Sequence, residues 1–128
     1  MKAIGYKENL PIEDVKSLQD IEIDIPKAKG KDILVEIKAI SVNPADYKVR
    51  AGMPVEGDDW KIIGWDATGI VKEVGEDVTL FRVGDEVWYA GDLTRQGSYA
   101  QYQVVDERIV GKKPSSLSYA EAAALPLT

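Results

Sequence analysis

Ser41-Val42-Asn43-Pro44-Ala45-Asp46 and Gly64-Trp65-Asp66-Ala67-Thr68-Gly69 are the two stretches that decide the fold of this chain. Each follows an apolar run that is typical of a β-strand, and each contains proline or glycine residues that turn the backbone. Loops at strand ends often carry binding residues, because the sheet holds them in place. The side chains of Asn43, Asp46, Trp65 and Asp66 are therefore our first candidates for a functional site.

The first stretch has the composition of a helix start. Asn43 is a preferred N-cap residue, Pro44 fits the first helical position, and Asp46 places an acid in the first turn. Gly52 is expected to end this helix about two turns later. Helix capping alone would account for Asn43 and Asp46, so a structural role and a role in ligand binding both stay open.

Outside these stretches the sequence predicts mostly short strands separated by glycine turns. Apolar and polar residues alternate in segments 21–25, 33–40 and 98–105, and the runs 78–81 and 87–90 favour a further strand pair. A second helix is expected after Ser118, which forms a capping-box spacing with Glu121. Many short strands and little helix indicate a mainly β fold, built as a small closed or partly closed barrel.

The composition limits the chemistry. The 128 residues contain no cysteine and no histidine, which excludes thiolate and imidazole catalysis, disulfides and ordinary zinc sites. A net charge of −6 argues against nucleic acid as a partner, because phosphate backbones are bound through lysine and arginine. No window of the sequence is long and apolar enough to span a membrane, and the charges near Met1 do not fit a signal peptide. We therefore expect a cytoplasmic chain of one domain.

Three further segments extend the pattern, and they are Val83-Gly84-Asp85-Glu86-Val87, Gly97-Ser98-Tyr99-Ala100-Gln101-Tyr102 and Glu121-Ala122-Ala123-Ala124-Leu125-Pro126-Leu127-Thr128. Together with the first two stretches, and in this order, they resemble the GroES-like catalytic domain of the medium-chain dehydrogenase/reductase superfamily. The chain looks most similar to quinone oxidoreductase-like proteins and to the alcohol dehydrogenase-like proteins beside them. Each segment alone is a weak signal, but the ordered set is specific and covers almost the whole chain.

The resemblance implies that residues 1–128 form a GroES-like, partly closed β-barrel with a few short helices. In the family, a Rossmann domain for the cofactor follows the position of Thr128, and this chain contains no Gly-x-Gly-x-x-Gly turn. We therefore expect a fragment of a longer protein. The resemblance implies that the full-length protein is a homodimer. The fragment alone is expected to bind cofactor poorly and to catalyse little.

The resemblance also implies roles for single residues. It places Asn43 beside the nicotinamide and the substrate, Pro44, Ala45 and Thr128 along the cofactor, and Tyr47, Lys48 and Trp65 around the substrate cleft. Asn43, Tyr47 and Lys48 are the implied catalytic residues. Quinone oxidoreductases often have a tyrosine at the position of Lys48, which leaves the proton donor open. Asp46 and Asp66 are expected to support the site, and we favour Trp65 as a wall of the core or cleft, because an indole mainly contributes contact area.

The zinc-dependent branch of the family differs at the same positions. It has a cysteine where this chain has Asn43, and a histidine–glutamate pair where this chain has Trp65-Asp66. Its cysteine-rich structural lobe has no counterpart between Tyr89 and Ser98. Because Asp46 and Asp66 alone do not supply the three or four ligands that zinc normally takes, we predict no metal.

The sequence therefore predicts the catalytic-domain fragment of a zinc-independent oxidoreductase. The full-length enzyme would transfer a hydride from NADPH or NADH to a small molecule, either a quinone or an activated carbonyl or enone compound. The identity of the substrate and the choice of cofactor stay open, because the missing domain decides both. Two alternatives remain, a stand-alone GroES-like barrel that acts as a non-catalytic binding module and, less favoured, an alcohol dehydrogenase.

Overall fold

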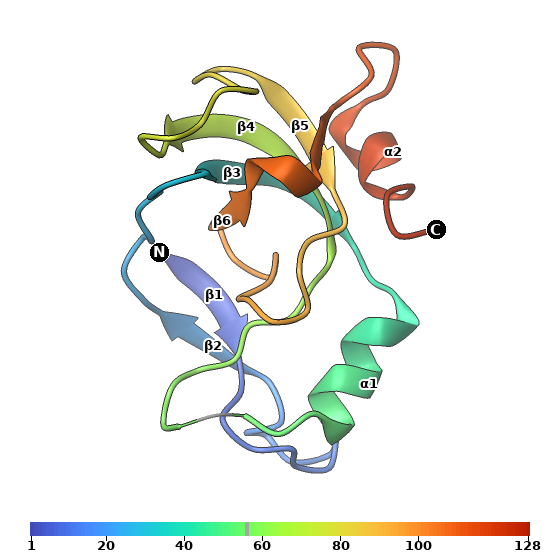
Figure 1. Cartoon of the computed structure of the whole chain (residues 1–128). Helices are drawn as coiled ribbons and strands as arrows, with labels where there is room; N and C mark the ends of the chain where they lie inside the picture. Colours follow the sequence, from blue (N-terminus) through green and yellow to red (C-terminus); the bar gives the residue numbers. More distant parts are fainter. Residues whose placement is uncertain (56) are drawn as a thin grey trace.

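The computed structural model of the protein describes residues 1–55 and 57–128 and contains two antiparallel sheets (Figure 1). The smaller sheet pairs β1 (Lys2–Gly5) with β2 (Gln19–Glu22). The larger sheet has the strand order β6-β3-β4-β5-β7. Its members are β3 (Asp32–Ser41), β4 (Asp66–Val74), β5 (Glu86–Tyr89), β6 (Tyr102–Asp106) and β7 (Val110–Lys112). The strands curve without closing, which confirms the predicted mainly β, partly closed barrel.

Two short α-helices accompany the sheets, α1 (Pro44–Gly52) and α2 (Tyr119–Ala123), together with the 3-10 turn η1 (Glu107–Ile109). Both α-helices begin where the sequence predicted. The N–H of Asn43 donates to Asp46 Oδ2 at 2.8 Å, and Ser118 and Glu121 exchange hydrogen bonds as a capping box. Figure 1 shows both helices on the same flank of the molecule, with α2 and the C-terminus close to β4 and β5.

The main core lies on one face of the large sheet. It consists of apolar side chains from β3, β4, β5 and β6, namely Ile33, Val35, Ala67, Val71, Val87, Tyr89 and Val105. Tyr6, Ile63 and Trp65 form a second buried cluster, against which Ala45 and Val49 of α1 pack. This second cluster fixes the position of α1 relative to β4.

The register of β3 and β4 brings the two decisive stretches together. The strands are antiparallel, and Ser41 at the end of β3 lies opposite Asp66 at the start of β4. Gly69 lies opposite Ile37, where a β-carbon would be only 2.2 Å from the carbonyl oxygen of Glu36. Only glycine allows this close approach, so Gly69 helps to set the register that pairs Ser41 with Asp66.

Three strand predictions were wrong in part or in full. In segment 98–105 the strand β6 begins only at Tyr102, and residues 98–101 lie outside it. The ladder between β1 and β2 ends at Lys2 and Glu22, with one more bond from the Ile23 N–H to the Met1 oxygen, so segment 23–25 is not a strand. Segment 78–81 is not a strand either. The buried carboxylate of Glu107 accepts hydrogen bonds from the N–H groups of Thr79 and Leu80, which a strand would have used for pairing.

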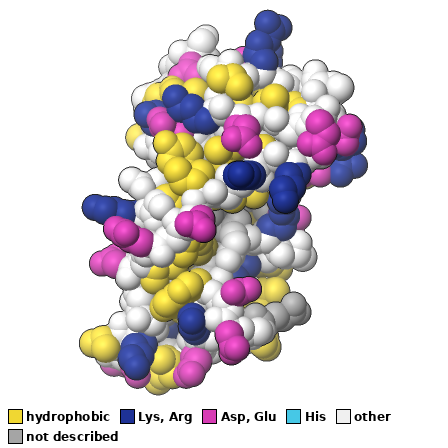
Figure 2. Space-filling model, turned by 90° about the vertical axis from the view of Figure 1, so that its left-hand side faces the viewer, with side chains coloured by type: hydrophobic (Ala, Val, Ile, Leu, Met, Phe, Trp, Pro, Cys, Tyr) yellow, Lys and Arg dark blue, Asp and Glu magenta, His cyan; other side chains and the backbone are white. Residues whose placement is uncertain are grey.

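The surface carries both signs of charge. On the face seen in Figure 2, acidic and basic side chains lie side by side with hydrophobic side chains between them. Within residues 1–55 and 57–128, no helix has the length and hydrophobicity needed to cross a membrane.

Candidate active site

A fully buried carboxylate, that of Asp66, stands at the start of β4 and joins three segments of the chain. Its Oδ2 accepts a hydrogen bond from Ser41 Oγ at 2.7 Å and another from Asn43 Nδ2 at 2.8 Å. Its Oδ1 accepts the backbone N–H of Leu127 at 2.7 Å. We call these four residues the Asp66 cluster. The cluster fixes the end of β3, the start of α1 and the C-terminal segment at one point.

Asn43 is held at two places. Its backbone N–H is bound by Asp46, as described above, and its side-chain nitrogen by Asp66. A carboxylate only accepts hydrogen bonds, so the amide nitrogen of Asn43 must be the atom that faces Asp66. The Asn43 side chain also faces the backbone N–H of Asp46 as one half of a capping box, and the residue keeps 8% of its surface exposed.

Asp46 is the second buried acid beside Asn43. Its Oδ2 accepts hydrogen bonds from the Asn43 N–H and from the Tyr99 hydroxyl, the latter at 3.0 Å. Burial, together with the adjacent Asp46 carboxylate, raises the pKa of the Tyr99 hydroxyl, which therefore stays a donor. Asp46 Oδ1 is buried and has no partner among the described residues, which leaves one oxygen of this carboxylate uncompensated.

The other residues expected at the site lie around this pair of acids. Pro44 and Thr128 are exposed, and Ala45 is half-buried. Tyr47 and Lys48 lie on the solvent side of α1, where 60% of Tyr47 is exposed, and neither side chain makes a hydrogen bond within the described residues. Trp65 is buried in the second core cluster. The structure thus brings Asn43, Asp46 and Asp66 together, while Tyr47 and Lys48 project away from them.

Three participants were not foreseen from the sequence. Ser41 and the Leu127 backbone complete the Asp66 cluster, and Tyr99 binds Asp46. Ser41 Oγ also lies 2.8 Å from the carbonyl oxygen of Ala123, in α2. The antiparallel pairing of the two decisive stretches was the only sequence signal that could have pointed to Ser41. Nothing comparable marked Tyr99 or Leu127, because both contacts arise from the tertiary fold.

These residues do not fit a zinc site. Both oxygens of Asp66 accept hydrogen bonds, the nitrogen of Asn43 faces Asp66, and Trp65 offers no ligand atom. Within residues 1–55 and 57–128 no group of three or more acids could hold a metal ion. Among the buried side-chain oxygens of Asn43, Asp46 and Asp66 in the described residues, Asp46 Oδ1 has no hydrogen-bond partner, and a single oxygen does not make a zinc site.

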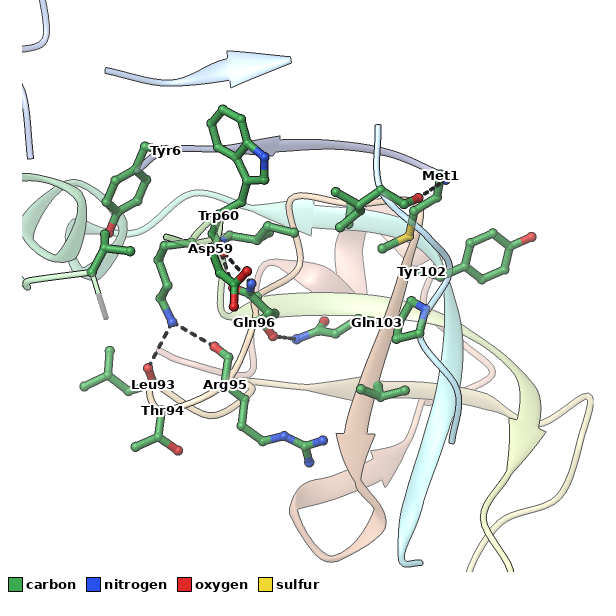
Figure 3. A pocket seen from close by; sticks show the side chains of 18 of the residues that line it. Met1, Tyr6, Asp59, Trp60, Leu93, Thr94, Arg95, Gln96, Tyr102 and Gln103 are labelled. Atoms are coloured by element: carbon green, nitrogen blue, oxygen red, sulfur yellow. Dashed lines mark hydrogen bonds between the residues drawn. The ribbon is translucent and has the colours of Figure 1, made fainter. Parts of the chain in front are cut away.

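A separate cavity of about 670 Å³ lies between residues 53–55, residues 59–62, residues 93–97 and β6 (Figure 3). Its polar walls are largely paired within the protein. Lys61 Nζ donates to the Arg95 oxygen at 2.9 Å, and Gln103 Nε2 donates to the Gln96 oxygen at 3.1 Å. Burial lowers the pKa of Lys61. None of the residues expected at the site lines this cavity, so it is distinct from the Asp66 cluster.

Comparison with known proteins identifies the family. The family model of the alcohol dehydrogenase GroES-like domain matches residues 29–115, and the chain belongs to this family. This places it in the medium-chain dehydrogenase/reductase superfamily, as the resemblance implied, among oxidoreductases of the alcohol dehydrogenase-like and quinone oxidoreductase types.

Three relatives illustrate the range. A zinc-type alcohol dehydrogenase-like protein of Staphylococcus aureus strain Mu50 is 44% identical over 128 residues, which are 100% of this chain and 38% of the relative. A crystal structure from Rhizobium etli CFN 42, provisionally assigned as a zinc-dependent alcohol dehydrogenase, is 61% identical with a TM-score of 0.94 and covers 99% of this chain and 37% of that one. Escherichia coli quinone oxidoreductase complexed with NADPH is 28% identical with a TM-score of 0.84, over 98% of this chain and 37% of that one. The chain thus spans less than two fifths of each of these three proteins.

Proposed function

We propose that this chain is the catalytic domain of a longer, zinc-independent NAD(P)H-dependent reductase of quinones or activated carbonyl and enone compounds. The observation that carries the proposal is the hydrogen bond between Asn43 and Asp66. It occupies the positions where the zinc-dependent branch has metal ligands, and it uses up the groups that could otherwise face a metal.

The residues around Asn43 suit one edge of a nicotinamide. Asn43 keeps a small part of its surface exposed, and Pro44 and Thr128 offer further exposed surface. When bound, NADPH or NADH would supply the hydride, which needs no metal in the protein. The chain itself has no glycine-rich turn for the pyrophosphate, so we assign the greater part of cofactor binding to a further domain.

Tyr47 and Lys48 are the donors proposed for the substrate. Both are exposed on α1, one helical turn after Asn43, and neither is engaged within the described residues. Either could hydrogen-bond to a carbonyl or quinone oxygen as negative charge develops on it. A positioned donor of this kind commonly changes a rate by about 10²-fold or more.

The relatives differ in what they favour. The Escherichia coli quinone oxidoreductase is complexed with NADPH, whereas the Staphylococcus relative is named as zinc-type and the Rhizobium relative as zinc-dependent. Our proposal of a zinc-independent enzyme is supported by the residues present, since Asn43 and Trp65 stand where the zinc-dependent branch has a cysteine and a histidine. Alcohol oxidation is the alternative that those zinc-type descriptions favour.

The test is an assay of the longer protein that contains this domain. We expect it to oxidise NADPH or NADH in the presence of simple quinones or enones, and to show little oxidation of alcohols with NADP⁺ or NAD⁺. The 128-residue chain, run in parallel, should be inactive. Faster turnover of alcohols than of every quinone and enone tried would reverse the assignment, and tight binding of a protein without any turnover would favour the binding-module alternative.

A further inference from the structure

We infer that the free edge of β3 between Lys38 and Ser41 takes up one more strand, which a segment of the longer protein outside these 128 residues supplies. The added strand pairs with β3 on the side that faces away from β4. The inference rests on the proposed longer protein but not on its reductase chemistry. It bears on the candidate site, because Ser41 ends this strand and Asn43 caps the helix that follows.

β3 has a neighbouring strand on both sides over only part of its length. β6 pairs with residues 32–36, and one further hydrogen bond joins the Ile37 N–H to the Gln101 oxygen at 2.9 Å. β4, by contrast, follows β3 to its last residue. Within residues 1–55 and 57–128, no backbone hydrogen bond reaches residues 38–41 from the side opposite β4. The last turn of this strand therefore has an open edge.

The edge is open because the two sheets separate at this point. Residues 99–101 leave β3 and bind β1, where the Ile4 N–H donates to the Tyr99 oxygen at 2.9 Å and the Gln101 N–H donates to the Lys2 oxygen at 3.1 Å. A groove of about 880 Å³ lies between the end of β3 and the smaller sheet. It is lined by residues 2–4, 20–22, 37–40, 42 and 98–101.

The groove offers apolar side chains next to the unpaired backbone. Ile40 is 39% exposed, Val42 is 73% exposed, and Ile4 on β1 is 40% exposed. The charged side chains among the lining residues are two lysines and two acids, so neither sign dominates. Backbone hydrogen bonds combined with apolar contacts are how an extended segment adds to the edge of a sheet. The matching occupant is therefore an extended segment with apolar residues at alternate positions.

A segment of the longer protein fits this edge better than a second copy of the chain. The edge carries Lys38, and a lysine on a sheet edge hinders the pairing of two identical edges. The chain spans 38% of the Staphylococcus relative, so a protein of that length has further segments to supply. The Leu127 N–H is bound to Asp66, opposite Ser41, so the residues that follow in a longer protein would start beside this end of β3.

Amide hydrogen exchange of the longer protein, resolved to single residues by mass spectrometry, tests the pairing. A strand with one neighbour protects only about half of its amides, because successive N–H groups point to opposite sides. We expect all the amides of residues 38–41 to exchange slowly, as slowly as those of residues 32–36, which have a neighbour on each side. Rapid exchange of alternate amides in residues 38–41 would overturn the inference, and so would protection that disappears on dilution, which would assign the edge to a second copy.

Photo-crosslinking identifies the source of the added strand. A p-benzoylphenylalanine in place of Val42 puts the reactive group in the groove, on a side chain that is largely exposed in this chain. We expect crosslinks within one molecule of the longer protein, to a segment beyond residue 128. Crosslinks confined to residues 1–128, or formed only between two molecules, would contradict the assignment.

A pair of lysine substitutions provides a matched control. Ile40 lines the groove, whereas Val83 is 58% exposed and lies outside it. In the longer protein, I40K should lower the urea midpoint of unfolding and speed the exchange of residues 38–41 by about tenfold or more, whereas V83K should change neither. Equal effects of I40K and V83K would show that residue 40 is no more covered than residue 83. None of these readings needs a substrate or cofactor, so failure of the reductase proposal leaves them unaffected.

Discussion

At the scale of single residues, Asp66 and Glu107 show how this domain accommodates buried carboxylates. Asp66 accepts three hydrogen bonds, and Glu107 accepts the N–H groups of Thr79 and Leu80. Neither takes part in an ion pair within residues 1–55 and 57–128. Their charge is stabilised by neutral donors, so a substitution would leave several buried donors unpaired, each at a cost of about 1–3 kcal/mol.

Tyr89 gives a pH-dependent prediction. Its hydroxyl is buried in the core and donates to Gln103 Oε1 at 2.8 Å, and burial raises its pKa well above the ordinary value. In the unfolded chain a tyrosine ionises near pH 10. The stabilisation is therefore complete below about pH 10 and is lost as the pH rises further, by about 1.4 kcal/mol per pH unit for this residue.

The measurement is urea unfolding between pH 8 and pH 11.5 for the wild type and Y89F. We expect Y89F to be less stable at pH 8, because Gln103 loses its donor, but to lose stability less steeply above pH 10. Burial also raises the pKa of Tyr6 and Tyr99, so the slope should be reduced and not abolished. Identical slopes for the two proteins would show that Tyr89 ionises in the folded state as readily as in the unfolded chain.

At the scale of secondary-structure elements, local sequence signals correctly predicted those elements that depend on interactions between residues close in the sequence. The alternation in segment 33–40 predicted β3, and the cap residues predicted the starts of α1 and α2. Segment 78–81 has the composition of a strand but no partner strand, since Glu107 takes its N–H groups. That competitor is distant in the sequence, so no local pattern could have revealed it.

The candidate site, too, could be predicted from the sequence only as far as local signals reach. The turn residues of the two decisive stretches predicted that Asn43, Asp46 and Asp66 would lie near strand ends. Their joining by Ser41, Tyr99 and Leu127 depends on the β3–β4 register and on the path of the C-terminal segment. A shift of one residue would turn Ser41 to the other face of the sheet. Such contacts follow from the assembled fold and not from any single segment.

The register itself can be tested at Gly69. An alanine there would put its β-carbon 2.2 Å from the Glu36 oxygen and 2.6 Å from Val35 Cγ1, so β3 and β4 would have to separate. We expect G69A to lower the free energy of unfolding by about 1–3 kcal/mol. The control G52A, at the end of α1, has no heavy atom within 4 Å of the new β-carbon and should be neutral or stabilising by up to about 1 kcal/mol. Urea unfolding compares the two variants, and equal stability of G69A and G52A would contradict the close approach of β3 and β4.

At the scale of the whole molecule, the chain corresponds to one part of its relatives. It spans 38% of the Staphylococcus relative and 37% of the Escherichia coli quinone oxidoreductase. Within this part, the Asp66 cluster links the start of α1 to the C-terminal segment at Leu127. The proposed role of the domain is therefore to hold Asn43 and the exposed face of α1 against a cofactor that a further domain binds.

The most direct test of the central claim is turnover of the longer protein in the presence of a chelator, together with its metal content. We predict that NADPH or NADH oxidation with a quinone or enone continues at an unchanged rate after treatment with EDTA, and that the purified protein contains far less than one zinc per chain. Activity that disappears with EDTA and returns on addition of zinc, with about one bound zinc per chain, would contradict the claim. The metal would then have to be held by ligands outside the Asp66 cluster.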